Sequence, residues 1–162
     1  MASDATVSVV TSDPNSPSVA SASFAELSLH QLYAVLQLRV DVFVVEQQCP
    51  YAELDGLDTD PGAEHFWIEA GIPGKVVATL RVLQVDGRPR IGRVATAWSH
   101  RQRGYAAALM RAALAHVGER EITLEAQSHL QQWYAGFGFV RSGEDYDEDG
   151  IRHVHMRREP QA

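Results

Sequence analysis

The chain has little cysteine, no long apolar run and fewer basic than acidic residues. Its one cysteine, Cys49, cannot form an intrachain disulfide, which excludes a disulfide scaffold and suits a reducing compartment. No stretch approaches the ~18 apolar residues of a membrane-spanning helix, and the first residues lack the basic and apolar regions of a secretory signal. We therefore expect a cytoplasmic protein that does not bind membranes.

The charge balance narrows the class of partner. The sequence holds 14 Lys and Arg residues against 21 Asp and Glu residues, which gives a net charge of −7. Nucleic-acid binding depends on neutralising phosphates, so this balance disfavours nucleic acid and suits a cationic substrate.

The length and composition fit a single globular domain with one core, since 45% of the 162 residues are hydrophobic. Residues 1–22 are rich in Ser, Thr, Val and Ala without a sustained period, and we predict that they form a flexible leader. The domain is then expected over residues 23–162, with no repeat and no second boundary.

Hydrophobic periodicity predicts a mixed α and β chain. After the N-cap residue Ser28, helical spacing predicts an amphipathic helix with an apolar face of Leu29, Leu32, Tyr33 and Leu36. Segment 38–58 is expected to change from helix to loop. A second helix is expected after Gly104, with a buried stripe of Ala106, Met110, Ala113, Leu114 and Val117. Strands are predicted at 24–27, 65–70, 76–85, 91–97, 122–126 and 151–156, and a short helix at 129–137.

The hexapeptide RQRGYA, residues 101–106, lies between a predicted strand and a predicted helix. Free backbone N–H groups and the positive end of the helix dipole meet there, so an anion can dock. Gly104 lets the backbone approach a ligand, and Ala106 and Ala107 keep the first helical turn open. Arg101 and Arg103 add positive charge. These parts fit a pyrophosphate, although an ordinary helix start can also hold Gly and Arg.

The sequence on both sides of this loop resembles a known family. The pattern V-A-T-A-x-x-x-R-x-x-G-x-A-x-x-L-M, residues 94–110, is similar to motif A of the GNAT superfamily of acetyl-CoA-dependent N-acetyltransferases. LEAQSHLQQWYAGFGF, residues 124–139, looks like motif B of that family, with matches at Tyr134, Gly138 and Phe139. LRVDVFVVEQQCPYAELDGLD and GEDYDEDGIRHVHM resemble the ElaA branch, and this narrower resemblance covers residues 24–157.

The resemblance implies an α/β (α+β) fold whose central, mostly antiparallel sheet splays between its fourth and fifth strands and is flanked by helices. Acetyl-CoA would lie in that cleft as a co-substrate. The backbone of the fourth strand would bind the pantetheine arm and the acetyl carbonyl. The loop and the start of the following helix would bind the pyrophosphate, and one side-chain amide would bind the CoA arm. In this sequence these residues are Val94, Ala95 and Thr96; Arg101, Gln102, Arg103, Gly104, Tyr105, Ala106 and Ala107; and Gln127.

Two side chains are the candidate catalytic residues. Tyr134 falls where many family members place the tyrosine that protonates the departing thiolate, and a phenol with a pKa of about 10 can do this. A core-packing tyrosine is the alternative. Glu46, on a segment that in this family lies over the acceptor side, is the candidate base for the acceptor amine. It can instead simply face water, and three other carboxylates have similar claims: Asp41, Glu53 and Asp55.

The implied activity is direct transfer of an acetyl group to the amine of a small molecule or protein. The competing hypothesis is a non-catalytic acyl-CoA-binding module that senses acetyl-CoA and contacts a protein. A metal hydrolase built on His153 and His155 is disfavoured because two ligands are too few, so no metal is expected. The acidic run EDYDED, residues 144–149, is expected to be a solvated turn or to attract a cationic acceptor. Members of this family are often dimers, which allows a homodimer here.

Overall fold

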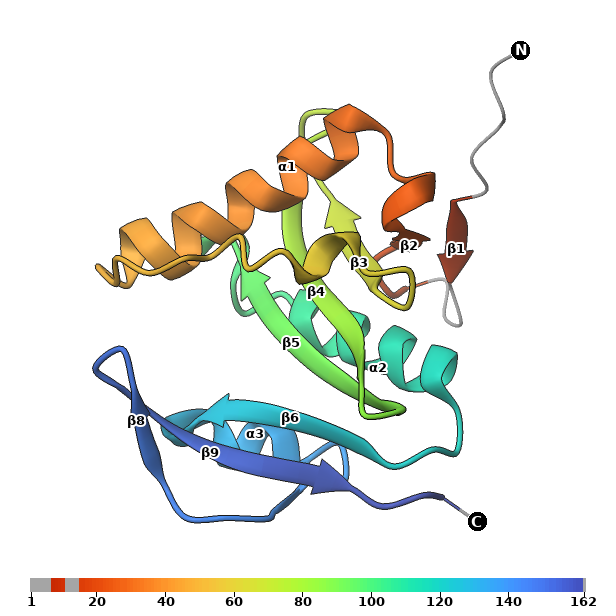
Figure 1. Ribbon diagram of the computed structural model, residues 1–162. Helices are drawn as coiled ribbons and strands as arrows, with labels where there is room; N and C mark the ends of the chain where they lie inside the picture. The colour runs from red at the N-terminus through yellow and green to blue at the C-terminus, as the bar shows by residue number, and fades with distance from the viewer. Residues whose placement is uncertain (1–6, 11–14, 162) are drawn as a thin grey trace.

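The computed structural model describes residues 7–10 and 15–161, which form one sheet with helices on both faces (Figure 1). The sheet order is β1 (Ser8–Val10), β2 (Val19–Ser23), β3 (Glu64–Glu69), β4 (Val76–Val85), β5 (Arg88–Thr96), β6 (Ile122–Gln127), β9 (Ile151–Arg158) and β7 (Val140–Arg141), while β8 (Tyr146–Glu148) also pairs with β9. Paired strands are antiparallel except β5 and β6, which are parallel. This is the mixed, mostly antiparallel α/β sheet that the sequence predicts.

The sheet begins earlier in the chain than the expected domain start at residue 23. Strand β2 pairs with β3, and Ala22 is buried. Residues 1–6 and 11–14 of the expected leader lie outside the described residues. The strand predicted at 24–27 is wrong, because Phe24–Glu26 form a 3-10 helix in which the Glu26 carboxylate accepts hydrogen bonds from the backbone and hydroxyl of Ser23.

Helix α1 (Leu29–Arg39) starts as predicted, because the Ser28 hydroxyl accepts a hydrogen bond from the Gln31 N–H group. Its predicted apolar face is wrong: Leu29 and Tyr33 are 83% and 72% exposed. The helix packs on β4 and β5 through a different stripe, which continues into a π-helix (Val40–Glu46) and consists of Val35, Leu38 and Val42. The predicted change from helix to loop follows Glu46.

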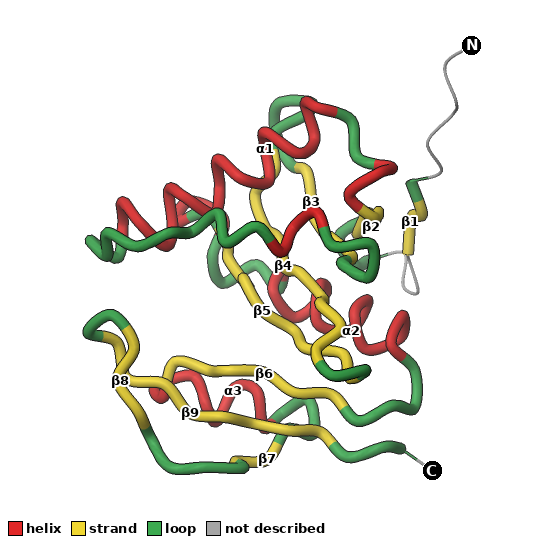
Figure 2. The backbone as a smooth tube through the Cα atoms, in the orientation of Figure 1, coloured by secondary structure: helices red, strands yellow, loops and turns green. Residues whose placement is uncertain are grey.

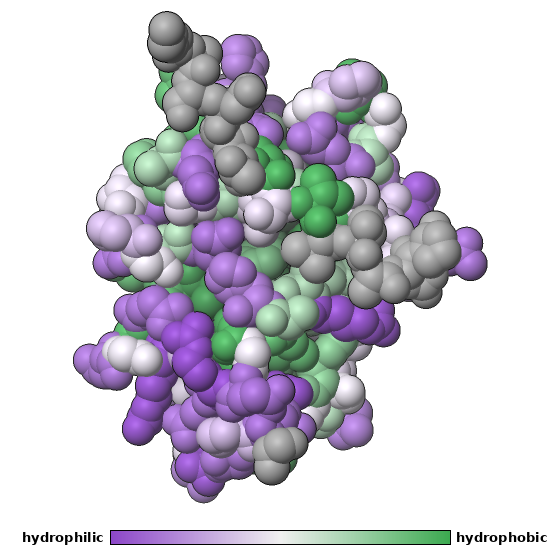
Figure 3. Space-filling model, turned by 90° about the vertical axis from the view of Figure 1, so that its right-hand side faces the viewer, coloured by the Kyte–Doolittle hydropathy of each residue, from purple (hydrophilic) through white to green (hydrophobic). Residues whose placement is uncertain are grey.

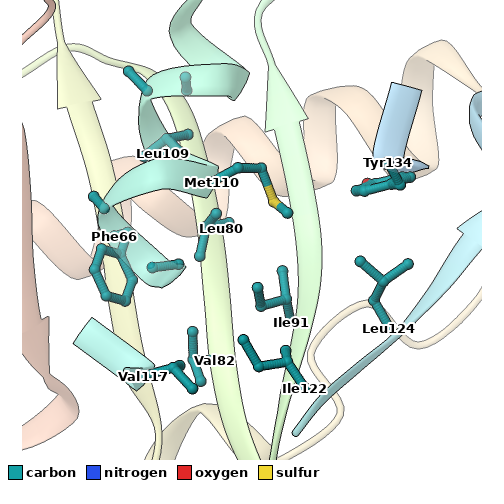
Figure 4. Close-up of a cluster of buried hydrophobic side chains, with 14 of the residues drawn as sticks. Phe66, Leu80, Val82, Ile91, Leu109, Met110, Val117, Ile122, Leu124 and Tyr134 are labelled. Atoms are coloured by element: carbon teal, nitrogen blue, oxygen red, sulfur yellow. The ribbon is translucent and has the colours of Figure 1, made fainter. Parts of the chain in front are cut away.

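The opposite face of the sheet is covered by α2 (Tyr105–Val117). Of its predicted stripe, Met110, Ala113 and Val117 are buried, while Ala106 and Leu114 are only half-buried. The third helix, α3 (Gln131–Ala135), is shorter than expected and follows a 3-10 turn at Ser128–Leu130. It packs near β6 and β7. Figure 4 shows the core beneath these helices, to which β5 contributes Ile91 and β6 contributes Ile122 and Leu124.

Strands β5 and β6 separate along their length. They pair only at Arg90 with Thr123 and at Ile91 with Leu124, although β5 continues to Thr96 and β6 to Gln127. Their unpaired ends diverge, as Figure 2 shows. This is the splay expected between the fourth and fifth strands, one place later because β1 adds a strand at the start.

The surface carries no broad apolar belt on the face that Figure 3 shows. Hydrophilic side chains dominate its lower part, near the end of the chain, and hydrophobic ones lie in scattered groups above. Within residues 7–10 and 15–161, every helix is too short or too polar to cross a bilayer.

Candidate active site

A cleft of about 810 Å³ opens where β5 and β6 diverge. Its walls come from both strands, the start of α2, the π-helix and the β8–β9 turn. The structure brings together here all but one of the predicted site residues: Glu46, Val94, Ala95, Thr96, Arg101, Gln102, Gly104, Tyr105, Ala106, Ala107, Gln127 and Tyr134. The exception is Arg103, which is exposed in the loop and does not line the cleft.

The β5 wall presents backbone rather than side chains. The N–H group of Ala97 donates to the Val77 carbonyl on β4 at 2.8 Å. Because successive N–H groups of a strand point to opposite sides, the N–H group of Thr96 points away from β4, toward the β6 side. Strand β6 no longer pairs there, so this donor faces the cleft. The strand thereby offers a hydrogen bond to a ligand without a dedicated side chain.

A bulge interrupts β5 just before this stretch. Thr79 pairs with Ala95 but Arg81 pairs with Gly92, so two residues of β5 lie opposite the single residue Leu80. The first of the two, Arg93, has a φ of 54°, the left-handed region that glycine usually occupies in such bulges.

The loop before α2 forms the end of the cleft that suits an anion. Gln102 and Gly104 have positive φ values of 61° and 77°, and Gly104 is the N-cap of α2. No side chain caps this terminus, so N–H groups of the first helical turn, such as that of Ala106, are left for another acceptor. The loop therefore has the free donors and the dipole that the sequence predicts.

Tyr134 lies on α3 beside Leu124 of β6 (Figure 4). Its ring packs edge-on against Trp133 at 4.8 Å between centroids and against Phe139 at 6.4 Å. Burial raises the pKa of the Tyr134 phenol to about 12, so the hydroxyl keeps its proton at neutral pH. A protonated phenol on the cleft wall has the state that a proton donor needs, and its aromatic neighbours fix the ring.

The comparisons with known proteins agree with this geometry. A family model described as an acetyltransferase (GNAT) domain matches residues 37–160. The chain belongs to the GNAT acetyltransferase family. The resemblance read from the two motifs is thereby confirmed, and membership makes the chain an acyltransferase.

Relatives place this GNAT domain near ElaA. Protein ElaA of Escherichia coli K12 is 42% identical over 144 residues, which cover 83% of this chain and 92% of ElaA. A UPF0039 protein of Mycobacterium tuberculosis H37Rv is 45% identical over 137 residues, covering 82% and 87% of the two chains. The crystal structure of E. coli ElaA superposes with a TM-score of 0.81 at 38% identity, covering 87% of this chain and 98% of that one. An acyl-CoA N-acyltransferase from Pseudomonas aeruginosa gives 0.80 at 41% identity, covering 86% and 98%.

Glu46 of the GNAT domain is not free in the cleft. Both of its carboxylate oxygens meet the Arg101 guanidinium, at 2.6 Å and 2.9 Å. Arg101 also donates to the Thr96 carbonyl at 3.1 Å and lies 5.1 Å from the centre of the Trp98 ring. The guanidinium thus joins the π-helix to the end of β5, and its charge is already paired within the protein.

Two long contacts cross the mouth of the cleft. The Gln127 amide donates to the Gln47 side chain at 3.4 Å, and the Cys49 thiol lies 3.5 Å from the Asp149 carbonyl. His153 and His155 share a face as predicted, and both stack on Tyr146. Among the residues that the structure describes, no group of three or more His, Cys, Asp or Glu side chains could hold a metal ion.

The sequence analysis missed a largely buried ionic network at the cleft, three of whose members, Asp55, Arg81 and Arg93, also line the cleft. Three arginines from α1, β4 and β5 meet three carboxylates of the acidic loop (residues 47–63): Arg39, Arg81 and Arg93, and Glu53, Asp55 and Asp58. Arg39 contacts Glu53 at 2.6 Å and Asp58 at 2.5 Å, and Arg81 contacts Asp58 at 2.8 Å and Asp55 at 2.7 Å. Two of the suggested alternative bases, Glu53 and Asp55, are therefore paired with arginines, and of the two only Glu53 is buried.

The network lowers the pKa of two of its carboxylates, Asp55 and Asp58. Burial acts to raise the pKa of Asp55, but hydrogen bonds and charge from Arg81 and Arg93 lower it to about 2. Burial opposes the shift at Asp58 as well, where Arg39 and Arg81 lower the pKa. The only signal in the sequence is the coincidence of an acidic loop with arginines inside apolar segments, which does not say which charges pair.

Proposed function

We propose that this GNAT domain binds acetyl-CoA between β5 and β6 and transfers the acetyl group directly to the amine of a small molecule or protein. The observation that carries the proposal is the cleft itself. It joins the uncapped N-terminus of α2, a β5 edge that has lost its strand partner, and the buried phenol of Tyr134. In one cavity, these three features would provide a site for the pyrophosphate, backbone N–H donors for the acetyl carbonyl and a proton for the leaving group.

The backbone N–H groups of residues 102–107 would hold the pyrophosphate. The Arg101 guanidinium is already paired with Glu46, so we assign Arg101 to holding the cleft wall in place rather than to binding the pyrophosphate. The backbone of β5 at Val94, Ala95 and Thr96 would bind the pantetheine arm and the acetyl carbonyl. The Gln127 amide would give up its hydrogen bond to the Gln47 side chain and donate to the pantetheine arm instead. A backbone donor aimed at a developing oxyanion typically contributes about 10²–10³ in rate.

Tyr134 would supply the proton for the leaving group. The amine nitrogen forms the new C–N bond, the C–S bond breaks, and its electron pair leaves on sulfur, which takes the phenol proton. The amine proton passes to solvent and the phenol regains one from there. Glu46 has both oxygens on Arg101, so we assign it to positioning rather than to proton removal.

A cationic acceptor is favoured by the acceptor end of the cleft. Glu148 and Asp149, at the β8–β9 turn, line it, and both side chains are exposed. Carboxylates at a cleft mouth raise the local concentration of cations, and the net charge of −7 acts in the same direction. A polyamine or a lysine side chain has the matching chemistry.

The proposal is tested by titrating the protein with acetyl-CoA in a calorimeter and then following CoA release with a panel of amines. We expect micromolar binding and a rise in CoA release with at least one cationic amine. A folded protein that binds no acetyl-CoA would refute the cofactor assignment. Binding without turnover across a broad panel would instead favour a module that only binds acyl-CoA.

A Tyr134→Phe variant separates proton donation from packing. The ring remains and only the hydroxyl is lost, so we expect kcat to fall by about 10- to 100-fold with little change in acetyl-CoA affinity. We expect a smaller loss of kcat than the largest losses seen when a general acid is removed, because a thiol with a pKa of about 8.5 can leave without being protonated first. The same kcat for variant and parent would leave Tyr134 as a packing residue.

A further inference from the structure

The bulge in β5 holds a residue whose backbone conformation is unfavourable. Arg93 has a φ of 54°, and the left-handed region is unfavourable for a residue with a Cβ relative to the right-handed region. A residue of this kind persists only where its surroundings fix it. At Arg93, contacts of the side chain provide this restraint.

The Arg93 guanidinium is anchored at three places. Its Nε atom donates to a Glu53 carboxylate oxygen at 3.0 Å, and a terminal nitrogen donates to Asp55 at 3.2 Å. The guanidinium carbon lies 5.8 Å from the centre of the Tyr51 ring, and the Tyr51 hydroxyl donates to Glu53 in turn. Residues of the acidic loop thus bind the Arg93 side chain, which extends from the bulge.

The anchors are themselves rigid. The Glu53 side chain is only 2% exposed and is bonded to Arg39 of α1. Asp55 is held by a two-pronged contact with Arg81 of β4, at 2.9 Å and 2.7 Å. An arginine whose partners are themselves paired with other elements of the fold is restrained by them, and this restrains its own backbone as well.

The bulge directly precedes the cleft-lining stretch of β5. Val94 follows Arg93, and Ala95 resumes pairing with Thr79. A bulge adds one residue to the strand, so removing it shifts the register by one and turns the N–H groups that faced the cleft to the other side. The direction of the Thr96 donor therefore depends on the conformation of Arg93.

We propose that Arg93 is a positioning residue for acyl transfer, which keeps β5 in the bulged conformation that aims its backbone N–H groups at the acyl carbonyl. The inference rests on the proposed function, because it assumes that acetyl-CoA occupies this cleft. It adds a role for a residue whose guanidinium is paired with the acidic loop and which the sequence analysis did not single out. The acidic loop then serves catalysis through Arg93 as well as stability.

The test compares the affinities for acetyl-CoA and for CoA, which needs no knowledge of the acceptor. One hydrogen bond to the acetyl carbonyl predicts that the parent prefers acetyl-CoA by roughly 2- to 10-fold. In Arg93→Ala the Cβ penalty remains while the anchors are lost, so this preference should disappear. In Arg93→Gly the anchors are also lost, but glycine adopts a positive φ freely, so the preference should be kept within about 2-fold.

The outcomes separate the two proposals. A parent that binds neither compound would overturn the proposed function and, with it, this inference. A parent that binds both equally, an Arg93→Ala variant that keeps the preference, or equal loss in both variants would overturn the positioning role alone. If Arg93→Ala does not fold, as judged by circular dichroism, Arg93→Gln replaces it. The shorter neutral amide loses the charge and the Asp55 contact but keeps the Cβ, so we expect a smaller preference for acetyl-CoA than in the parent, and an unchanged preference would overturn the positioning role.

Discussion

A Gly104→Glu variant is expected to lose at least about 100-fold in affinity for acetyl-CoA, because it places a carboxylate at the helix N-terminus where the pyrophosphate would bind. A Cβ at this position meets no atom within 4 Å, so the side chain fits the folded protein. Its φ of 77° adds a backbone penalty of about 1 kcal/mol. Calorimetric titration of the folded variant measures the loss.

The other end of the same helix supplies a matched control. Gly118 has a φ of 73° and also has open space around a Cβ, so Gly118→Glu adds the same side chain, under a larger backbone strain because its ψ is −144° where that of Gly104 is 9°. It lies at the C-terminus of α2, roughly 20 Å from Gly104 at 1.5 Å per residue. We expect Gly118→Glu to bind acetyl-CoA like the parent. Equal affinity in both variants would show that the pyrophosphate does not lie on the α2 terminus.

The features that the sequence predicts here are the ones that depend on neighbouring residues. The stripe Met110, Ala113 and Val117 and the cap at Ser28 follow from spacing within one helix, and both are found. The loop at Gly104 could also be placed, because a strand, a glycine and a helix start follow one another directly. Local chemistry therefore located the loop at one end of the cleft, whereas the rest of the cleft wall was predicted from the family resemblance.

The features that the sequence did not predict depend on partners far along the chain. Glu46 meets Arg101 across 55 residues, and Arg93 meets Glu53 across 40. The face of α1 was misjudged for the same reason. Its stripe is set by where the π-helix and the sheet hold it, and they bury the charged residue Arg39 while leaving Tyr33 exposed. A run of acidic residues in a sequence usually indicates a solvated loop. The fold is needed to show that Arg39, Arg81 and Arg93 pair with the acidic loop here.

The buried network carries the largest expected effect on stability. An Arg39→Ala variant removes the partner that Glu53 and Asp58 share, and their side chains are only 2% and 9% exposed. Breaking a buried ion pair from one side typically costs about 3–5 kcal/mol, because a charge is left without compensation in a poorly solvated site. Arg93 and Arg81 still contact these carboxylates, so we expect the lower end of that range. This corresponds to a fall in Tm of roughly 6–12 °C for a chain of this length.

An exposed arginine tests whether the loss reflects burial rather than charge. Arg111 lies on the exposed face of α2, so Arg111→Ala removes the same side chain from a solvated site and should change the free energy of unfolding by no more than about 0.5 kcal/mol. Arg39→Lys should fall between the two variants, because a single ammonium cannot bridge both carboxylates as a guanidinium does. Thermal unfolding followed by circular dichroism ranks the three. If Arg39→Ala melts with Arg111→Ala, the acidic loop does not depend on Arg39, and the rigidity that this arginine would pass through Glu53 to Arg93 has another source.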